Sequence, residues 1–213
     1  MKIFRFLLYG TIIVITASWL SHTWLWKRDA VIHAGDRQMN NPGIFLTIEK
    51  LKNKAVASKL FVQQKGFNEN TCFLIDMSLP SRQARFFIYD LKRDSILYAG
   101  LVAHGNCFQN WLEGRKYSNV VGCGCTSLSK YKVGNSYIGK FGYSYKLYGL
   151  DSSNNNAFER TVVLHSHSCV PEKEVSDEIC QSLGCPMVSP GFLKQLKTII
   201  NSSKKPILLW IYE

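Results

Sequence analysis

The stretch that decides the fold is VLHSHSC, residues 163–169, followed by SLGCP at residues 182–186. The first part begins as an apolar strand that ends in His165, and the second is a glycine-containing turn that presents Cys185. The nucleophilic form of cysteine is the thiolate, and a nearby imidazole can take the thiol proton. A strand that ends in a candidate base, followed by a loop and then a turn that carries a candidate nucleophile, therefore predicts thiol-dependent acyl transfer.

The turn around the cysteine carries further candidate groups. Gly184 allows the backbone to pass close to the thiol, and the N–H groups of Gly184 and Cys185 are expected to face a developing oxyanion. Ser182 is expected to donate a hydrogen bond within the turn. His167 is a second, weaker candidate for the base.

The segments on either side predict a β-rich α+β domain with few helices. Alternating, β-branched and aromatic residues predict strands at 72–76, 85–91, 95–104, 143–148, 161–164 and 207–212. Apolar residues at helical spacing predict one or two helices over 44–64. Ser189 and Pro190 supply the N-cap and first-turn proline of another helix. The interval 105–150 is rich in glycine, serine and tyrosine, which favours long loops with short strands between them.

The N-terminus predicts export from the cytoplasm. A basic start is followed by an uncharged apolar run over 6–20, and then by Trp24 and Trp26. The run is intermediate in length between a signal-peptide core and a membrane span. Residues 1–26 are therefore interpreted as a signal peptide or signal anchor, 27–43 as a linker, and 44–213 as the catalytic domain. A periplasmic or cell-envelope location follows.

The net charge of +11 predicts attraction to polyanions. Lysine and arginine are spread along the chain without a nucleic-acid-binding motif, so nucleic acid is not expected as a partner. An anionic membrane surface and an anionic wall polymer both fit a basic surface.

Seven cysteines are consistent with an oxidising compartment. Because the number is odd, six could form disulfides and leave Cys185 as a free thiol. Cys123 and Cys125 are too close in sequence to pair comfortably with each other. The pairing is otherwise open.

Two other interpretations of the same residues compete with catalysis. Cys123 and Cys125, together with the His165–Cys169 stretch, could supply four zinc ligands, although the usual C-x-x-C spacing is absent. A papain-like peptidase is disfavoured because its cysteine precedes its histidine in the chain, and here the order is reversed.

The chain resembles the L,D-transpeptidases, in particular the murein L,D-transpeptidase catalytic-domain branch, over roughly residues 45–213. His165 and the run 182–185 resemble the H…S-x-G-C signature of the family. Further matching motifs, in the expected order, are LIDMSLPS (74–81), FIYDL (87–91), LVAHG (101–105), YSN (117–119), TSL (126–128), GKFGYS (139–144), YGLD (148–151) and the Asn155, Ala157 and Arg160 set. Two positions depart from the usual pattern: Ser166 replaces a glycine, and Met187 replaces an arginine. These departures motivate a third interpretation, a non-catalytic envelope-binding module on the same fold.

The resemblance implies acyl transfer on peptidoglycan stem peptides, with no cofactor or metal. Cys185 is the implied nucleophile and His165 the implied base, with Ser182 and Gly184 in the catalytic turn. The thioester would pass to an amine in a transpeptidase or to water in a carboxypeptidase. The implied substrate-binding residues are His104, Gly105, Ser118, Asn119, Ser127, Tyr143, Ser166 and His167. The sequence defines no oligomeric state.

Overall fold

The computed structural model describes the backbone of residues 42–213 and the side chains from residue 46 onward. The predicted signal or anchor segment, and all but the last two residues of the predicted linker, lie outside the described residues. From residue 42 to the C-terminus, no helix combines the length and apolar character that crossing a membrane requires.

The described part contains a β-sheet, two α-helices and one 3-10 helix. The helices are α2 (Pro42–Lys65), η1 (Asn155–Ala157) and α3 (Pro190–Ser202). The strands are β1 (Thr71–Asp76), β2 (Phe86–Asp90), β3 (Ser95–Gly100), β4 (Val102–Ala103), β5 (Ser129–Gly139), β6 (Gly142–Gly149), β7 (Val163–Ser166), β8 (Met187–Val188) and β9 (Leu208–Tyr212). The predicted β-rich α+β class is confirmed.

The strands form one curled sheet with the order β3-β2-β1-β9-β5-β6-β7-β8-β4. The β1–β9 and β7–β8 pairs are parallel, and the other pairs are antiparallel. Strands β3 and β4 stand at opposite ends of this order, yet only Leu101 separates them in the chain. The sheet must therefore curl until its two ends meet, in the manner of a barrel.

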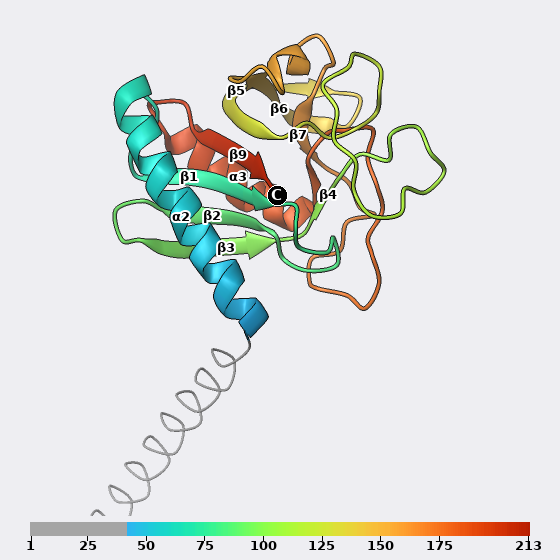
Figure 1. The fold of residues 1–213 in the computed structure, drawn as a ribbon. Helices are drawn as coiled ribbons and strands as arrows, with labels where there is room; N and C mark the ends of the chain where they lie inside the picture. The colour runs from blue at the N-terminus through green and yellow to red at the C-terminus, as the bar shows by residue number, and fades with distance from the viewer. Residues whose placement is uncertain (1–41) are drawn as a thin grey trace, which may run out of the picture. The chain divides into compact units, whose positions relative to one another are not determined.

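One part of the sheet is covered on both faces by helices (Figure 1). Leu51, Ala55 and Val62 of α2 belong to one apolar cluster, together with Leu74 of β1 and Phe87 of β2. The alternate residues of the same strands contribute to a second cluster, which includes α3. Because successive side chains of a strand point to opposite faces, β1 is buried on both sides.

Helix α3 begins as its sequence predicts. Ser189 is the N-cap, and its hydroxyl accepts a hydrogen bond from the Phe192 N–H at 3.2 Å. Phe192, Leu193 and Leu196 then face the core. The helix thereby anchors the chain that leaves the Cys185 turn.

The interval 105–150 is more regular than its composition predicts. Strand β5 runs for 11 residues and pairs with both β6 and β9, so it is central to the sheet. Glycine and serine weaken its local strand signal, and its ladder forms through long-range pairing with β9. The loops are confined to 104–128, which matters because these loops surround Cys185.

Candidate functional site

Cys185 lies beside β7, in the turn that leads into β8. Its Sγ accepts the Val163 N–H at 3.5 Å and lies 3.9 Å from the Thr161 carbonyl oxygen. Val163 and His165 are two residues apart on β7, so their side chains share a face of the sheet. The parallel pairing of β7 with β8 sets His165 opposite Met187, two residues beyond the cysteine. The fold thus holds the thiol of the candidate nucleophile against the strand that carries the candidate base.

The turn before the thiol is held by Ser182. Its Oγ donates to the Cys185 carbonyl oxygen at 2.7 Å and accepts the Gly184 N–H at 3.1 Å. The Gly184 N–H therefore does not face an oxyanion, contrary to the expectation from sequence. The Cys185 N–H has no hydrogen-bond acceptor within residues 42–213, so this amide is available to an oxyanion.

Glycine is required where three backbone segments meet at the turn. Gly184 has φ +105°, and a Cβ there would lie 2.6 Å from the Cys125 carbonyl oxygen. A Cβ on Gly105 would overlap the Gly124 oxygen and lie 2.8 Å from the Gly184 Cα. Gly105 is in turn bridged to Ser182. Side chains at these two positions would push the nucleophile away from β7.

His165 is buried, at 2 % exposure, and its tautomer follows from its contacts. Its Nδ1 lies 3.2 Å from the Ser166 carbonyl oxygen, which can only accept, so Nδ1 carries the proton. The unprotonated Nε2 of the neutral ring is then free to act as a base. Phe141, at the β5–β6 turn, stacks on the imidazole with ring centroids 4.4 Å apart. This contact fixes the ring and shields it from water.

Burial controls the ionisation of both groups. It raises the pKa of the Cys185 thiol, whereas the Val163 N–H and the charge of Arg160 act in the opposite direction. Burial also lowers the pKa of His165, only partly offset by its hydrogen bond to Ser166. Both shifts favour a neutral thiol and a neutral imidazole at neutral pH. The arrangement suits general-base activation rather than a preformed ion pair.

Cys185 and His165 line a hollow of about 490 Å³. Its other walls come from the 106–124 loop, the β5–β6 turn, the 160–169 segment and residues 181–187. Arg160 is the only lysine, arginine, aspartate or glutamate among the described residues that line it. A hollow of this size can hold several residues of an extended peptide, with the thiol at its wall.

Arg160 holds the 118–127 loop through hydrogen bonds. Its Nη1 donates to the Ser118 carbonyl oxygen and to Ser127 Oγ, both at 2.9 Å. Its Nη2 donates to the Cys125 carbonyl oxygen and lies 3.4 Å from Cys123 Sγ. One guanidinium therefore fixes the 118–127 loop against the Cys185 turn and places a positive charge next to the site.

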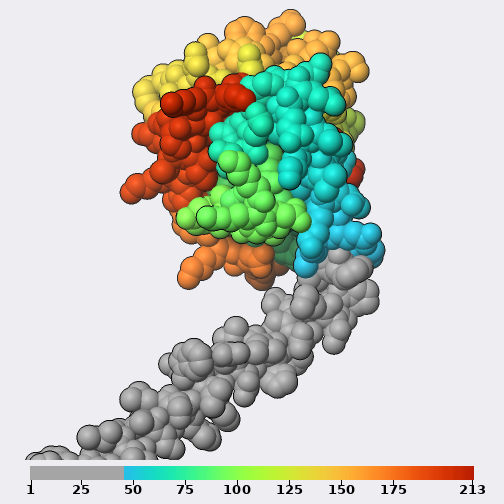
Figure 2. Space-filling view, turned by 90° about the vertical axis from the view of Figure 1, so that its left-hand side faces the viewer, coloured from blue at the N-terminus to red at the C-terminus, as the bar shows by residue number. Residues whose placement is uncertain are grey.

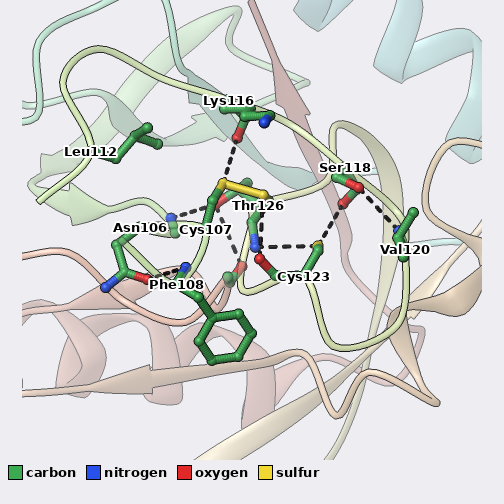
Figure 3. Close-up of a disulfide and its surroundings, with 12 residues drawn as sticks. Asn106, Cys107, Phe108, Leu112, Lys116, Ser118, Val120, Cys123 and Thr126 are labelled. Atoms are coloured by element: carbon green, nitrogen blue, oxygen red, sulfur yellow. Dashed lines mark hydrogen bonds between the residues drawn. A yellow bond between two sulfur atoms is a disulfide. The ribbon is translucent and has the colours of Figure 1, made fainter. Parts of the chain in front are cut away.

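A disulfide closes the same loop (Figure 3). Cys107 is bonded to Cys125, and the Cys123 thiol lies beside this bond, 3.3 Å from the Cys125 N–H. The second disulfide joins Cys169 to Cys180, across the segment between His165 and the nucleophile. Cys125 and Cys169 are therefore occupied, which removes two of the ligands that the zinc hypothesis requires.

The hypothesis of three disulfides is wrong for this structure. Cys72, Cys123 and Cys185 are free thiols, and the other four cysteines form two bonds. Cys72 is fully buried on β1. Cys123 is separated by one residue from Cys125, which is already bonded to Cys107. Burial raises the pKa of the Cys72 thiol to about 12, so Cys72 is chemically inert at neutral pH.

The substrate-binding residues expected from sequence are only partly brought together. Of that group, the lining of the hollow includes His167. Ser118 and Ser127 act on the site through Arg160, and the Asn119 side chain binds Ser152 and Asn155. Tyr143 lies outside the lining and contacts Asn201 and Lys197. Ser166 and Gly105 contribute backbone contacts.

His104 is buried and does not line the hollow. Its Nδ1 lies 3.0 Å from Arg85 Nη2, which can only donate, so Nδ1 accepts. The Nε2–H then donates to the Gly114 carbonyl oxygen at 3.1 Å. Burial and the Arg85 charge lower the pKa of His104 to about 4. The neutral His104 ring therefore holds the 105–114 loop in place through its hydrogen bond to the Gly114 carbonyl oxygen.

Sequence reasoning missed Phe141, Thr161 and, as a site residue, Arg160. Phe141 is nearly half exposed (46 %) at the tip of a hairpin, and an exposed aromatic residue in a Gly-Lys-Phe-Gly turn was a usable signal. Thr161 has φ +55°, an unusual conformation for a β-branched residue, and no sequence pattern indicates it. Arg160 is identified only by its tertiary contacts.

Residues 46–212 match the family model described as the L,D-transpeptidase catalytic domain. No curated protein matches the chain.

Several solved structures are similar to it. An L,D-transpeptidase from Xylanimonas cellulosilytica aligns with 15% identity and a TM-score of 0.39, over 67% of this chain and 60% of that one. An L,D-transpeptidase from Mycobacterium smegmatis aligns with 9% identity and a TM-score of 0.41, over 68% and 59%. The helical cell shape determining protein Pgp2 from Campylobacter jejuni aligns with 12% identity and a TM-score of 0.43, over 67% and 47%. The chain thus spans about half to three fifths of their length.

Proposed function

Because the chain belongs to the L,D-transpeptidase catalytic domain family, we propose that it is a cell-envelope enzyme that transfers acyl groups from peptidoglycan stem peptides. The reaction proceeds through a thioester on Cys185, with His165 as the base. The observation that carries the proposal is the contact between Cys185 Sγ and the Val163 N–H. This contact holds the thiol against β7, the strand on which His165 follows Val163 by two residues.

The chemistry follows from the neutral pair. His165 Nε2 takes the thiol proton while Sγ attacks the carbonyl carbon that precedes the terminal D-residue of the stem peptide. The Cys185 N–H stabilises the oxyanion that forms. The C–N bond then breaks, and the imidazolium returns the proton to the departing amine. An amine acceptor next attacks the thioester to give a crosslink, or water attacks it to give a shortened peptide.

Arg160 supplies a cation to this site without a contact to the sulfur. Met187 stands where the family pattern usually has arginine, so the site lacks the charge expected two residues after the nucleophile. Arg160 lines the hollow from the segment that leads into β7, and it opposes the effect of burial on the thiol. We assign it the role of a positioning residue that also favours the developing thiolate.

The location of the enzyme is part of the proposal. The family acts on the cell wall, and the disulfides suit an oxidising compartment. Residues 1–26 are proposed to direct the domain out of the cytoplasm as a signal peptide or anchor. The linker 27–43 then separates this segment from the catalytic domain.

The first test is covalent trapping of the nucleophile. The purified protein is incubated with a carbapenem, whose strained lactam acylates an activated thiol, and intact mass is recorded. We expect one adduct on the parent protein and none on Cys185→Ala. Cys123→Ala is the matched control, because it removes another free thiol and should keep the adduct.

The second test uses a disaccharide tetrapeptide and follows its products by chromatography and mass spectrometry. A crosslinked dimer identifies a transpeptidase, and a tripeptide with a free D-residue identifies a carboxypeptidase. If the folded protein gives neither an adduct nor a product but still binds sacculi, the catalytic proposal fails. The non-catalytic binding module is then the correct function.

A further inference from the structure

A second hollow, separate from the thiol site, has the composition of an anion-binding groove. Its volume is about 580 Å³, and it lies between the β5–β6 hairpin, the end of α3 and the turn before β9. No residue lines both hollows. Figure 2 shows the face on which the hairpin (yellow) adjoins the C-terminal segment (red).

The charge of this groove is of one sign. Lys132, Lys204 and Lys205 line it, and the described lining residues include no aspartate or glutamate. Lys205 is paired with Glu69 at 2.8 Å, outside the groove. Lys132 and Lys204 form no ion pair with any described residue. A concave surface with cations of one sign focuses its field on an anion.

The groove also has a built shape. The β5–β6 register shifts between Val133 and Ser136, so Gly134 and Asn135 bulge out of the ladder and line the groove. A Cβ on Gly134 would overlap the Tyr148 ring, and this ring carries Lys132 Nζ 4.7 Å from its centroid. This wall of the groove therefore presents the Tyr148 ring next to the amide groups of Gly134 and Asn135 and the Lys132 cation. Such a surface suits a chain of sugars or peptide groups.

A neighbouring hollow of about 460 Å³ extends the groove. It shares Ser203, Lys204 and Lys205 with the first, and it adds Lys92 together with Glu69, the ion-pair partner of Lys205. Lys92 thus adds one further cation beyond the turn before β9, next to the neutralised Lys205–Glu69 pair. An extended polymer can follow such a path, whereas a flat membrane surface cannot enter a concave one.

We propose that this groove, defined by Lys132, Lys204 and Tyr148, binds a carboxylate-bearing segment of the peptidoglycan strand, away from the scissile bond. The inference rests on the proposed function because it names the polymer on which that site acts. The groove holds the strand while the thiol site engages one of its stem peptides.

The binding test uses the Cys185→Ala protein, so that its result does not depend on turnover. Sacculi stripped of other polymers are the ligand, and Lys132→Gln/Lys204→Gln is the variant. Lys52→Gln/Lys59→Gln on exposed α2 positions is the control, because it removes the same charge. We expect about tenfold weaker binding for the groove variant only, as two screened charge contacts predict. Sacculi with amidated carboxylates should bind equally weakly to all three proteins.

The kinetic test separates the groove from the reaction centre. With Cys185 intact, the groove variant should raise KM for sacculi about tenfold and leave kcat/KM for a soluble disaccharide tetrapeptide unchanged. Equal losses in the groove and control variants would overturn the proposal. So would loss of binding to vesicles of anionic phosphatidylglycerol with unchanged binding to sacculi, which would identify a membrane-binding surface. If no substrate is turned over, the catalytic proposal fails while the binding test still decides the groove.

Discussion

Replacing Gly184 with alanine tests how the nucleophile is held. At φ +105° an alanine is strained, at a cost of about 1–3 kcal/mol. Its Cβ would also lie 2.6 Å from the Cys125 carbonyl oxygen and 3.2 Å from Arg160 Nη2. Relieving this overlap requires a backbone shift, which costs about 1–3 kcal/mol more. The expected loss in the free energy of unfolding is therefore about 2–6 kcal/mol.

Gly66→Ala isolates the first of these two costs. Gly66 has φ +72°, and nothing lies within 4 Å of the position of its Cβ. The Gly66→Ala variant should lose only the conformational part of the free energy of unfolding, about 1–2 kcal/mol. Urea denaturation followed by tryptophan fluorescence gives both free energies, and intact mass after carbapenem addition gives the acylation rates.

The expected activities differ more than the stabilities. A shift of about 1 Å in the Cys185 turn should slow acylation about 100-fold in Gly184→Ala. Gly66→Ala should be acylated at the parent rate. If the two variants lose equal stability and react equally fast, the close packing of the turn against the Cys125 carbonyl does not position the nucleophile.

Three further outcomes follow from buried groups and their contacts. The pKa of His104 is about 4 when folded against 6.5 in its unperturbed state, so the unfolded chain binds more protons below pH 6.5. His104 should therefore lower the free energy of unfolding by about 2 kcal/mol between pH 7 and pH 5. In urea titrations His104→Gln should remove this contribution and leave the smaller dependence that comes from His165. Iodoacetamide at pH 8, mapped by peptide mass, should label Cys185 and leave Cys72 unmodified until the protein unfolds. Arg160→Gln should move the alkylation of Cys185 to higher pH, because the Arg160 cation opposes the rise in the thiol pKa that burial causes. Arg160→Lys should restore the pH profile of alkylation in part. An unchanged pH profile in both variants would exclude an electrostatic role.

The order of elements could be predicted because each carries its own local signal. The Ser189-Pro190 start of α3 and the hairpin of β2 and β3 are fixed by capping, turn and alternation patterns. His165 and Cys185 could also be proposed from the sequence as the catalytic pair, because both belong to the two short stretches that carry the family signature. Strand β5 was missed because its ladder is formed with β9, about 80 positions away in the chain.

What the sequence determines by itself is therefore local: the elements, the candidate pair Cys185 and His165, and the glycine beside the cysteine. The closure of the sheet, the two disulfides and the burial of His104 required the tertiary structure. The same is true of Arg160, which becomes a site residue only because folding places its guanidinium between two loops. These features depend on contacts between residues far apart in sequence, and no local propensity specifies which distant partner is met.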